Sequence, residues 1–199
     1  MIRFVRYTGG CGHTWGVETE GTVHSLTDRP AGVPSLADLT NERCLDQVRH
    51  EVENATLSQV PAADVAFLAP IPEPRKIVCA SLNYRDHAEE QDEEIPEKPL
   101  LFAKAPTTVT NPGSPIVHSG DERVDYEVGL AVVVGRPATD LSEAEVDDYV
   151  AGYTVLNDVS GRDARYPTAS SSAGRATTRF RRWVRRWSPA GSTTLTPSM

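Results

Sequence analysis

The first forty residues alternate apolar and polar side chains in short runs that are typical of β-strands. Three such runs occur, at 2–7, 14–19 and 22–26. Glu20-Gly21 separates the last two runs and is a turn signal. The alternation therefore predicts a small β unit at the start of the chain.

The spacing changes over residues 41–54, where apolar side chains recur every three or four positions beneath a charged face and predict a helix. Its apolar positions are Cys44, Leu45, Val48 and Val52. Prolines at 61, 70, 72 and 74 then interrupt any period around the short apolar run 65–68. We interpret that stretch as a linker and place a domain boundary near residue 71.

Strand-like and helical segments follow one another beyond this boundary. The predicted strands are 76–80, 99–104, 126–134 and 152–156, of which 126–134 is the most β-like stretch of the chain. Residues 84–90 predict a short helix, and Ser142 with Glu145 forms a capping box that opens a helix as far as about residue 150. Residues 111–113, Asn-Pro-Gly, are a turn signal.

The composition excludes several classes of protein. Cys11, Cys44 and Cys79 are widely spaced without a C-x-x-C pair, which argues against a disulfide framework or a zinc site and fits a reducing, cytoplasmic setting. No run approaches the roughly 18 apolar residues of a membrane span, and the first residues form no continuous apolar region for export. We expect neither membrane insertion nor secretion.

Charge is distributed unevenly along the chain, whose formal net charge is −8. Residues 1–163 hold 28 acidic and 13 basic side chains, whereas 164–199 hold seven arginines and no acidic residue. So acidic a body stays soluble by self-repulsion and argues against nucleic acid as a partner. It also resembles the surface of proteins from high-salt organisms, so we hypothesise that the protein is halophilic.

Three side chains are candidates for chemistry. Glu127 lies in an otherwise apolar strand and Asp158 follows the end of another, so their carboxylates are expected to converge at one end of a sheet. Such hard oxygen ligands suit magnesium, which takes one or two protein carboxylates. His87 precedes Glu90 by three residues on a predicted helix, which permits an orienting hydrogen bond to a general base. Most acidic residues and lone histidines have no such role, however.

Four segments of the chain favour a catalytic or metal-binding role for these candidate residues. They are KIVCASLNYRDHAEE at 76–90, PLLFAKAPTTVTNPGSPI at 99–116, ERVDYEVGLAVVVG at 122–135 and DYVAGYTVLNDVSGRD at 148–163. In composition, order and spacing they closely resemble the fumarylacetoacetate hydrolase family, in particular bacterial and archaeal members of the 2-hydroxyhepta-2,4-diene-1,7-dioate isomerase and acylpyruvase type. The resemblance implies a β-rich α+β fold: a small β-containing domain at 1–70, then the first part of a mixed β roll at 71–163.

The same resemblance implies roles for five residues. The family binds magnesium, or a similar divalent ion such as manganese or calcium, through an E-x-E pair on a strand and a later aspartate. Glu127 matches the first of these positions and Asp158 the last. His87 and Glu90 match a family H-x-x-E pair whose histidine activates water, and Lys104 matches a basic residue at the mouth of the site.

The implied chemistry passes through an enolate that the ion stabilises. Its substrate would be a small 2-oxo acid or 1,3-diketone, and its outcome carbon–carbon bond cleavage, tautomerisation or decarboxylation, among which the sequence does not choose. Relatives of this kind serve in aromatic catabolism, with neither nucleic acid nor membrane as partner. Family members are commonly homodimers, although this chain would lack much of the interface if its tail is not native.

The chain departs from the family at Gly129, where the pattern requires the second glutamate. Residues two apart on a strand face the same way, so position 129 should reach the ion together with Glu127, yet glycine offers no ligand. Water can fill the vacant position because magnesium keeps waters readily, but affinity for the ion should fall. A plain alternative is that Gly129 marks a β-bulge.

The tail after Asp163 departs further, because the family's Gly-Lys segment is missing and an Arg- and Ser-rich stretch replaces it. The possible codons of residues 167–188 can be translated in a shifted reading frame that starts from the third base of each codon. With permitted codon choices, this translation resembles the continuation found in the family. The genetic code fixes some residues of this shifted translation: Trp183 followed by Val184 can give only glycine. We therefore interpret 164–199 as an out-of-frame, disordered tail in preference to a basic arm for nucleic acid.

Two hypotheses about function remain. The first is a divalent-metal-dependent hydrolase or isomerase of 2-oxo acid or diketone substrates. The second is a catalytically inactive remnant of such an enzyme, encoded by a disrupted gene. They stay open together because one metal ligand and the later half of the catalytic domain have no counterpart in these residues.

Overall fold

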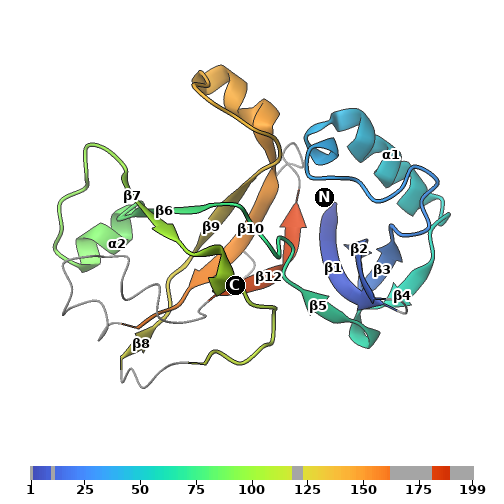
Figure 1. Ribbon diagram of the computed structural model, residues 1–199, viewed down its shortest axis with the longest axis horizontal. Coiled ribbons are helices and arrows are strands. Elements are labelled where there is room, and N and C mark those ends of the chain that lie inside the picture. Colours follow the sequence, from blue (N-terminus) through green and yellow to red (C-terminus); the bar gives the residue numbers. More distant parts are fainter. Residues whose placement is uncertain (1, 10–11, 118–122, 162–180, 189–199) are drawn as a thin grey trace. The chain divides into compact units, whose positions relative to one another are not determined.

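The computed structural model describes residues 2–9, 12–117, 123–161 and 181–188, which form many strands and a few short helices (Figure 1). The chain divides into two compact units. Unit 1 draws on Met1–Pro70, Val128–Leu156 and Trp183–Met199, and unit 2 on Ile71–Glu127 and Asn157–Arg182. Each unit is therefore assembled from separate stretches of sequence, and the domain limits 1–70 and 71–163 stay a prediction.

Unit 1 begins with the three strands that the alternation predicts. β1 (Arg3–Gly9), β2 (Gly12–Thr19) and β3 (Thr22–Ser25) pair antiparallel in chain order. The turn between β2 and β3 has positive φ at both central residues, 48° at Glu20 and 83° at Gly21, as a tight two-residue hairpin requires. Val5, Tyr7 and Val23 share one face of the sheet and form a buried cluster with Phe67.

The apolar run 65–68 is not a linker. It contains β5 (Ala66–Leu68), which pairs antiparallel with β1 and places Phe67 opposite Tyr7. β4 (Gln59–Pro61) likewise pairs with β3. A short 3-10 turn, η2 (Ala62–Asp64), connects β4 to β5. Both strands are only three residues long, and so short a run shows no alternation of apolar and polar side chains. The prolines nearby are typical of a linker, which is why the sequence did not predict these strands.

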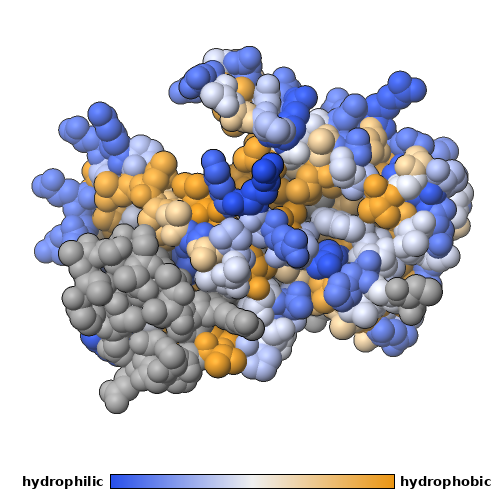
Figure 2. Space-filling model, viewed as in Figure 1, coloured by the Kyte–Doolittle hydropathy of each residue, from blue (hydrophilic) through white to orange (hydrophobic). Residues whose placement is uncertain are grey.

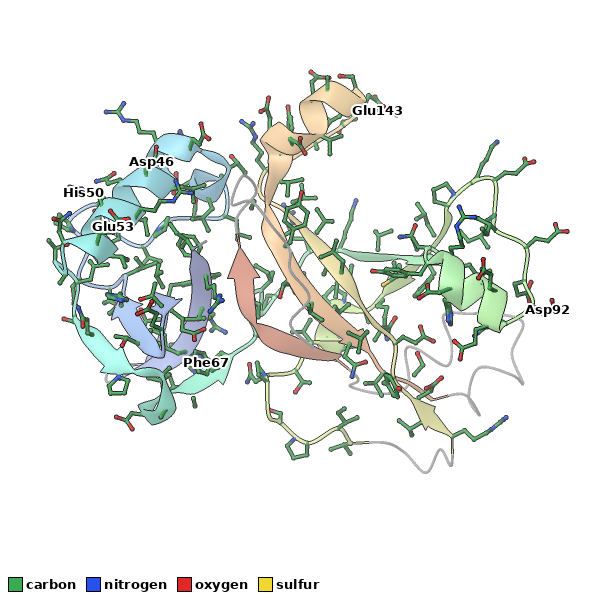
Figure 3. All side chains as sticks on the ribbon, turned by 180° about the vertical axis from the view of Figure 1, so that it is seen from behind. Asp46, His50, Glu53, Phe67, Asp92 and Glu143 are labelled. Atoms are coloured by element: carbon green, nitrogen blue, oxygen red, sulfur yellow. The ribbon has the colours of Figure 1, made fainter. Side chains whose placement is uncertain are left out.

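Helix α1 (Glu42–Glu53) confirms the helical spacing of this region. The helix starts where the side chain of Asn41 accepts a hydrogen bond from the Arg43 N–H at 3.0 Å. Leu45 and Val48 are its buried residues. Figure 3 shows Asp46, His50 and Glu53 along the outer side of α1, away from the strands. A second short helix, η1 (Asp38–Thr40), precedes it.

A long sheet continues from β1 in the order β4-β3-β2-β1-β12-β10-β9. β9 (Val128–Val134) and β10 (Val150–Asp158) match predicted strands. Between them, η4 (Glu143–Tyr149) begins at the predicted capping box, in which Glu145 accepts from the Ser142 N–H at 3.0 Å. Its turns are 3-10 and not α-helical.

The eight residues of β12 (Arg181–Ser188) fall in the stretch that the sequence places in a disordered tail. They form a strand that pairs antiparallel with β1, with Trp187 opposite Phe4. Tryptophan and valine favour extended backbone, which is consistent with this pairing. The rest of the predicted tail, 164–180 and 189–199, lies outside the described residues.

Unit 2 holds the remaining strands. β6 (Ile77–Ser81) and β7 (Leu100–Lys104) form a two-stranded antiparallel sheet, with helix α2 (Arg85–Glu90) in the connection between them. η3 (Pro106–Thr108) follows β7, and the predicted turn at 111–113 is closed by the Ser114 N–H donating to the Asn111 carbonyl at 3.2 Å. β8 (Val124–Asp125) pairs with β11 (Ser160–Gly161). No helix among the described residues is long and apolar enough to cross a membrane.

Candidate functional site

The pairing of β8 with β11 brings the two predicted carboxylates together. Ser160 lies opposite Asp125 in this antiparallel pair. The same register, carried two residues further, places Glu127 opposite Asp158, whose N–H donates to the Glu127 carbonyl at 2.8 Å. Side chains of directly opposed residues project from the same face, with Cβ atoms roughly 5 Å apart. Glu127 and Asp158 therefore start from neighbouring positions on one face.

Asn157 modifies this pairing, and sequence reasoning missed it. A regular ladder would direct the Glu127 N–H to the Asp158 carbonyl. Instead the Glu127 N–H donates to Asn157 Oδ1 at 3.1 Å, while the Ser160 hydroxyl donates to the Asp158 carbonyl at 3.3 Å. Side chains thus replace a backbone bond here, which fixes the backbone that carries both carboxylates. The only signal in the sequence was an amide immediately before Asp158.

Lys104 joins the pair from the end of β7. Its Nζ donates to Asp158 Oδ1 in a salt bridge. Lys104 is 4% exposed and Asp158 6%, so both charges are buried and each depends on the other. The sequence placed Lys104 at the mouth of the site, whereas the structure buries it against a predicted metal ligand.

His87 and Glu90 lie on α2, where Ala88 is the buried residue. His87 is half-buried and Glu90 exposed. The His87 N–H donates to its neighbour Asp86 at 3.0 Å. Within the described part of the chain, neither side chain forms a hydrogen bond or ion pair with Lys104, Glu127 or Asp158. The structure thus brings three of the five predicted residues together, and the roles of His87 and Glu90 stay predictions.

Gly129 stands two residues after Glu127, inside the continuous strand β9. It is not among the described glycines with positive φ. Its backbone conformation does not require glycine, because it lies outside the left-handed region that favours this residue. The φ angle at this position therefore does not exclude a glutamate.

These residues form an incomplete set of metal donors. Among the described residues, no three His, Cys, Asp or Glu side chains gather as a metal cluster would. Magnesium needs only one or two protein carboxylates, however, because it keeps several waters. Glu127 and Asp158 therefore fit a weakly held divalent ion, for which the Lys104 ammonium competes at Asp158.

A family model described as "Fumarylacetoacetate (FAA) hydrolase C-terminal" matches residues 76–192. The chain belongs to the fumarylacetoacetate hydrolase family. The matched range includes all five predicted site residues, so the recognition from the four motifs is confirmed. It also runs on through the stretch that we interpret as out of frame, most of which lies outside the described residues, and the frameshift stays a prediction.

Curated relatives in the fumarylacetoacetate hydrolase family include tautomerases. The chain is 34% identical over 171 residues to a fumarylacetoacetate hydrolase domain-containing protein 2 homolog of Dictyostelium discoideum, covering 82% of this chain and 56% of that protein. It is 48% identical over 107 residues to the oxaloacetate tautomerase YisK of Bacillus subtilis, covering 51% of this chain and 35% of that enzyme. The chain thus spans about half or less of the length of these relatives.

Solved structures of this family share the fold. Fumarylacetoacetate hydrolase from Exiguobacterium antarcticum superposes with a TM-score of 0.77 at 25% identity, over 98% of this chain and 69% of its own. Maleylpyruvate hydrolase from Sphingobium, solved with manganese(II) and pyruvate, gives a TM-score of 0.70 at 23% identity, over 96% and 68%. The predicted β-rich α+β fold is confirmed.

Proposed function

We propose that this chain carries part of a metal-assisted site that forms the enolate of a small 2-oxo acid. The observation that supports this most is that three charged residues lie together. Glu127 and Asp158 are opposed across a backbone pair, and Lys104 forms a salt bridge with Asp158. The 48% identity to an oxaloacetate tautomerase favours tautomerisation of a 2-oxo dicarboxylic acid over carbon–carbon bond cleavage.

The proposed roles follow from the chemistry of each side chain. Glu127 and Asp158 would hold the divalent ion, magnesium or manganese, which when bound acts as a Lewis acid toward the carbonyl oxygen of the substrate. Lys104 orients Asp158 through its salt bridge and adds a positive charge that attracts an anionic substrate. His87 would take the proton from the carbon beside the carbonyl, or from water if the reaction is a hydrolysis. This last role requires α2 to carry His87 to the substrate.

The test is an assay of the conversion of the enol form of oxaloacetate to the keto form. The reaction is monitored by the loss of the near-ultraviolet absorbance of the enol. We expect a rate above that of buffer with added manganese or magnesium, and its loss with EDTA. His87→Ala should lower the rate by roughly a hundredfold or more, as removal of a general base does. Glu89→Gln, at an exposed position on the same helix, should leave the rate unchanged.

The alternative is that the protein has no catalytic activity and is an inactive remnant of such an enzyme. Gly129 supports it, because the strand presents no side chain where a second carboxylate is needed. No activity in the wild type, with activity gained in Gly129→Glu, would favour the remnant. No activity and no metal binding in either protein would reject the assigned site itself.

A further inference from the structure

The ammonium of Lys104 lies on the covered side of the β6–β7 sheet. Side chains alternate along a strand, so Lys104 projects from the face opposite to Leu101, which is 65% exposed. Figure 2 shows apolar surface over these two strands, whereas Lys104 is only 4% exposed. The charge of Lys104 is therefore removed from water, and its salt bridge to Asp158 offsets part of the cost.

The carboxylates of the site stand on a backbone that hydrogen bonds hold in place. The Asp158 N–H donates to the Glu127 carbonyl at 2.8 Å, and the Glu127 N–H donates to Asn157 Oδ1 at 3.1 Å. Lys104 reaches Asp158 from the end of another strand of unit 2, through a flexible four-carbon stem. The ammonium is thus the partner that can change position, while the two carboxylates keep theirs.

The charges at the site make this mobility consequential. Two carboxylates, of Glu127 and Asp158, and one ammonium, of Lys104, sum to a net charge of −1. A divalent ion at Asp158 brings a second cation to a carboxylate that the ammonium already contacts. Like charges a few ångströms apart repel strongly where water is excluded. The ion and the ammonium therefore exclude one another at Asp158, and a displaced ammonium needs another anion.

We propose that Lys104 exchanges partners when the site is loaded, leaving Asp158 to the divalent ion and pairing with the second carboxylate of a 2-oxo dicarboxylic acid. This inference rests on the proposed function, because it concerns the same ion and the same substrate. The ion and the dicarboxylate then bind cooperatively, since each removes a cost that the other meets alone. Lys104 also selects dicarboxylates over monocarboxylates, because a monocarboxylate offers the displaced ammonium no replacement for Asp158.

Manganese binding to residues 1–199, measured by electron paramagnetic resonance, tests this coupling without turnover. The matched ligands are malate and lactate, which share a 2-hydroxy acid group and differ in the second carboxylate. Protein-free titrations correct for the manganese that each ligand chelates in solution. We expect saturating malate to raise the affinity for manganese by at least about tenfold, and lactate by less than about threefold. Saturating manganese should raise the affinity for malate by the same factor as malate raises that for manganese.

Substitutions at Lys104 test whether its charge carries the coupling. Lys104→Met removes the ammonium and keeps an unbranched side chain. Manganese alone should then bind at least about tenfold more tightly, and malate and lactate should change its affinity equally. Lys104→Arg keeps a buried counter-charge for Asp158, and its planar fork holds a carboxylate more firmly, so its affinity for manganese should fall below that of the wild type. Lys98→Met, at an exposed lysine shortly before β7, is the matched control and should titrate as the wild type does.

The outcomes separate the exchange from the metal site itself. Equal effects of malate and lactate in the wild type would overturn the exchange, and so would an unchanged or weaker affinity for manganese in folded Lys104→Met. Both results leave the ion bound, so the proposed function survives them. Absence of manganese binding in both the wild type and Lys104→Met would overturn the metal site and the exchange together. If Lys104→Met does not fold, the comparison of malate with lactate in the wild type and in Lys104→Arg decides.

Discussion

Lys104 and Asp158 are the residues on which the structure of the site depends most. Both are buried, and a buried charge that loses its partner is far more costly than an exposed one. Asp158→Asn keeps the shape of the side chain but leaves the ammonium of Lys104 without its counter-charge. We expect this change to lower the free energy of unfolding by about 3–5 kcal/mol, measured by urea denaturation.

An exposed ion pair provides the control for that measurement. Asp46 accepts from Arg49 at 2.5 Å on the outer surface of α1. Because solvent screens this pair, Asp46→Asn should change the free energy of unfolding by less than about 1 kcal/mol. Equal effects of the two substitutions would show that the Lys104–Asp158 pair is not buried in solution.

His24 makes the stability of unit 1 sensitive to acid. Its Nε2 lies 2.8 Å from the Thr19 hydroxyl, its Nδ1 is buried without a hydrogen-bond partner among the described residues, and burial lowers the pKa of the imidazole. The unfolded chain therefore binds a proton at a higher pH than the folded chain does. The free energy of unfolding should fall as pH drops below about 6.5, the ordinary value for histidine.

His24→Gln tests this dependence, because glutamine cannot take up the proton. The variant should show a flatter dependence of stability on pH between about 6.5 and 5. His13→Gln, at an exposed histidine, should keep the wild-type slope. If the His24 variant keeps the wild-type slope as well, the acid sensitivity has another origin.

The residues of the site were only partly predictable from sequence. Glu127 was a candidate because a carboxylate is unusual in an otherwise apolar strand. Asp158 was a candidate because it lies at the end of another strand. The partnership of Asp158 with Lys104 joins residues 54 positions apart, which no local pattern reveals. Asn157 was missed for the same reason, since its amide acts across a strand pair whose register the sequence does not state.

Periodicity predicted the longer helices and strands well and failed on the short ones. β1, β2 and α1 are long enough for their period to show. β5 has three residues and becomes a strand because β1 offers it a partner. The capping box located the start of η4 correctly but not its 3-10 geometry, because capping satisfies the first N–H groups in either kind of helix.

The start of α1 tests the contribution of capping directly. Asn41 accepts from the Arg43 N–H, and removal of such a cap exposes an unsatisfied donor. Asn41→Ala should lower the free energy of unfolding by about 1 kcal/mol, whereas Asn41→Asp should retain stability because aspartate caps equally well. Equal loss in both variants would mean that the amide NH₂ and not the capping oxygen matters.

The molecule as a whole is acidic, with a formal net charge of −8. Like charges repel in the compact state, and added salt screens them. If the surface is adapted to high salt, the thermal unfolding midpoint should rise as KCl increases from about 0.1 M to about 2 M. A midpoint that stays constant or falls over this range would contradict the halophilic hypothesis.

Metal binding is the property that connects the fold to the proposed function, and a manganese titration followed by electron paramagnetic resonance measures it without any substrate. We expect one weak site in the wild type, its loss in Glu127→Gln, and an affinity at least about tenfold higher in Gly129→Glu. Glu143→Gln, at an exposed position on η4, should bind as the wild type does. Identical titrations for all four proteins would contradict the assignment of Glu127 and position 129 to a metal site.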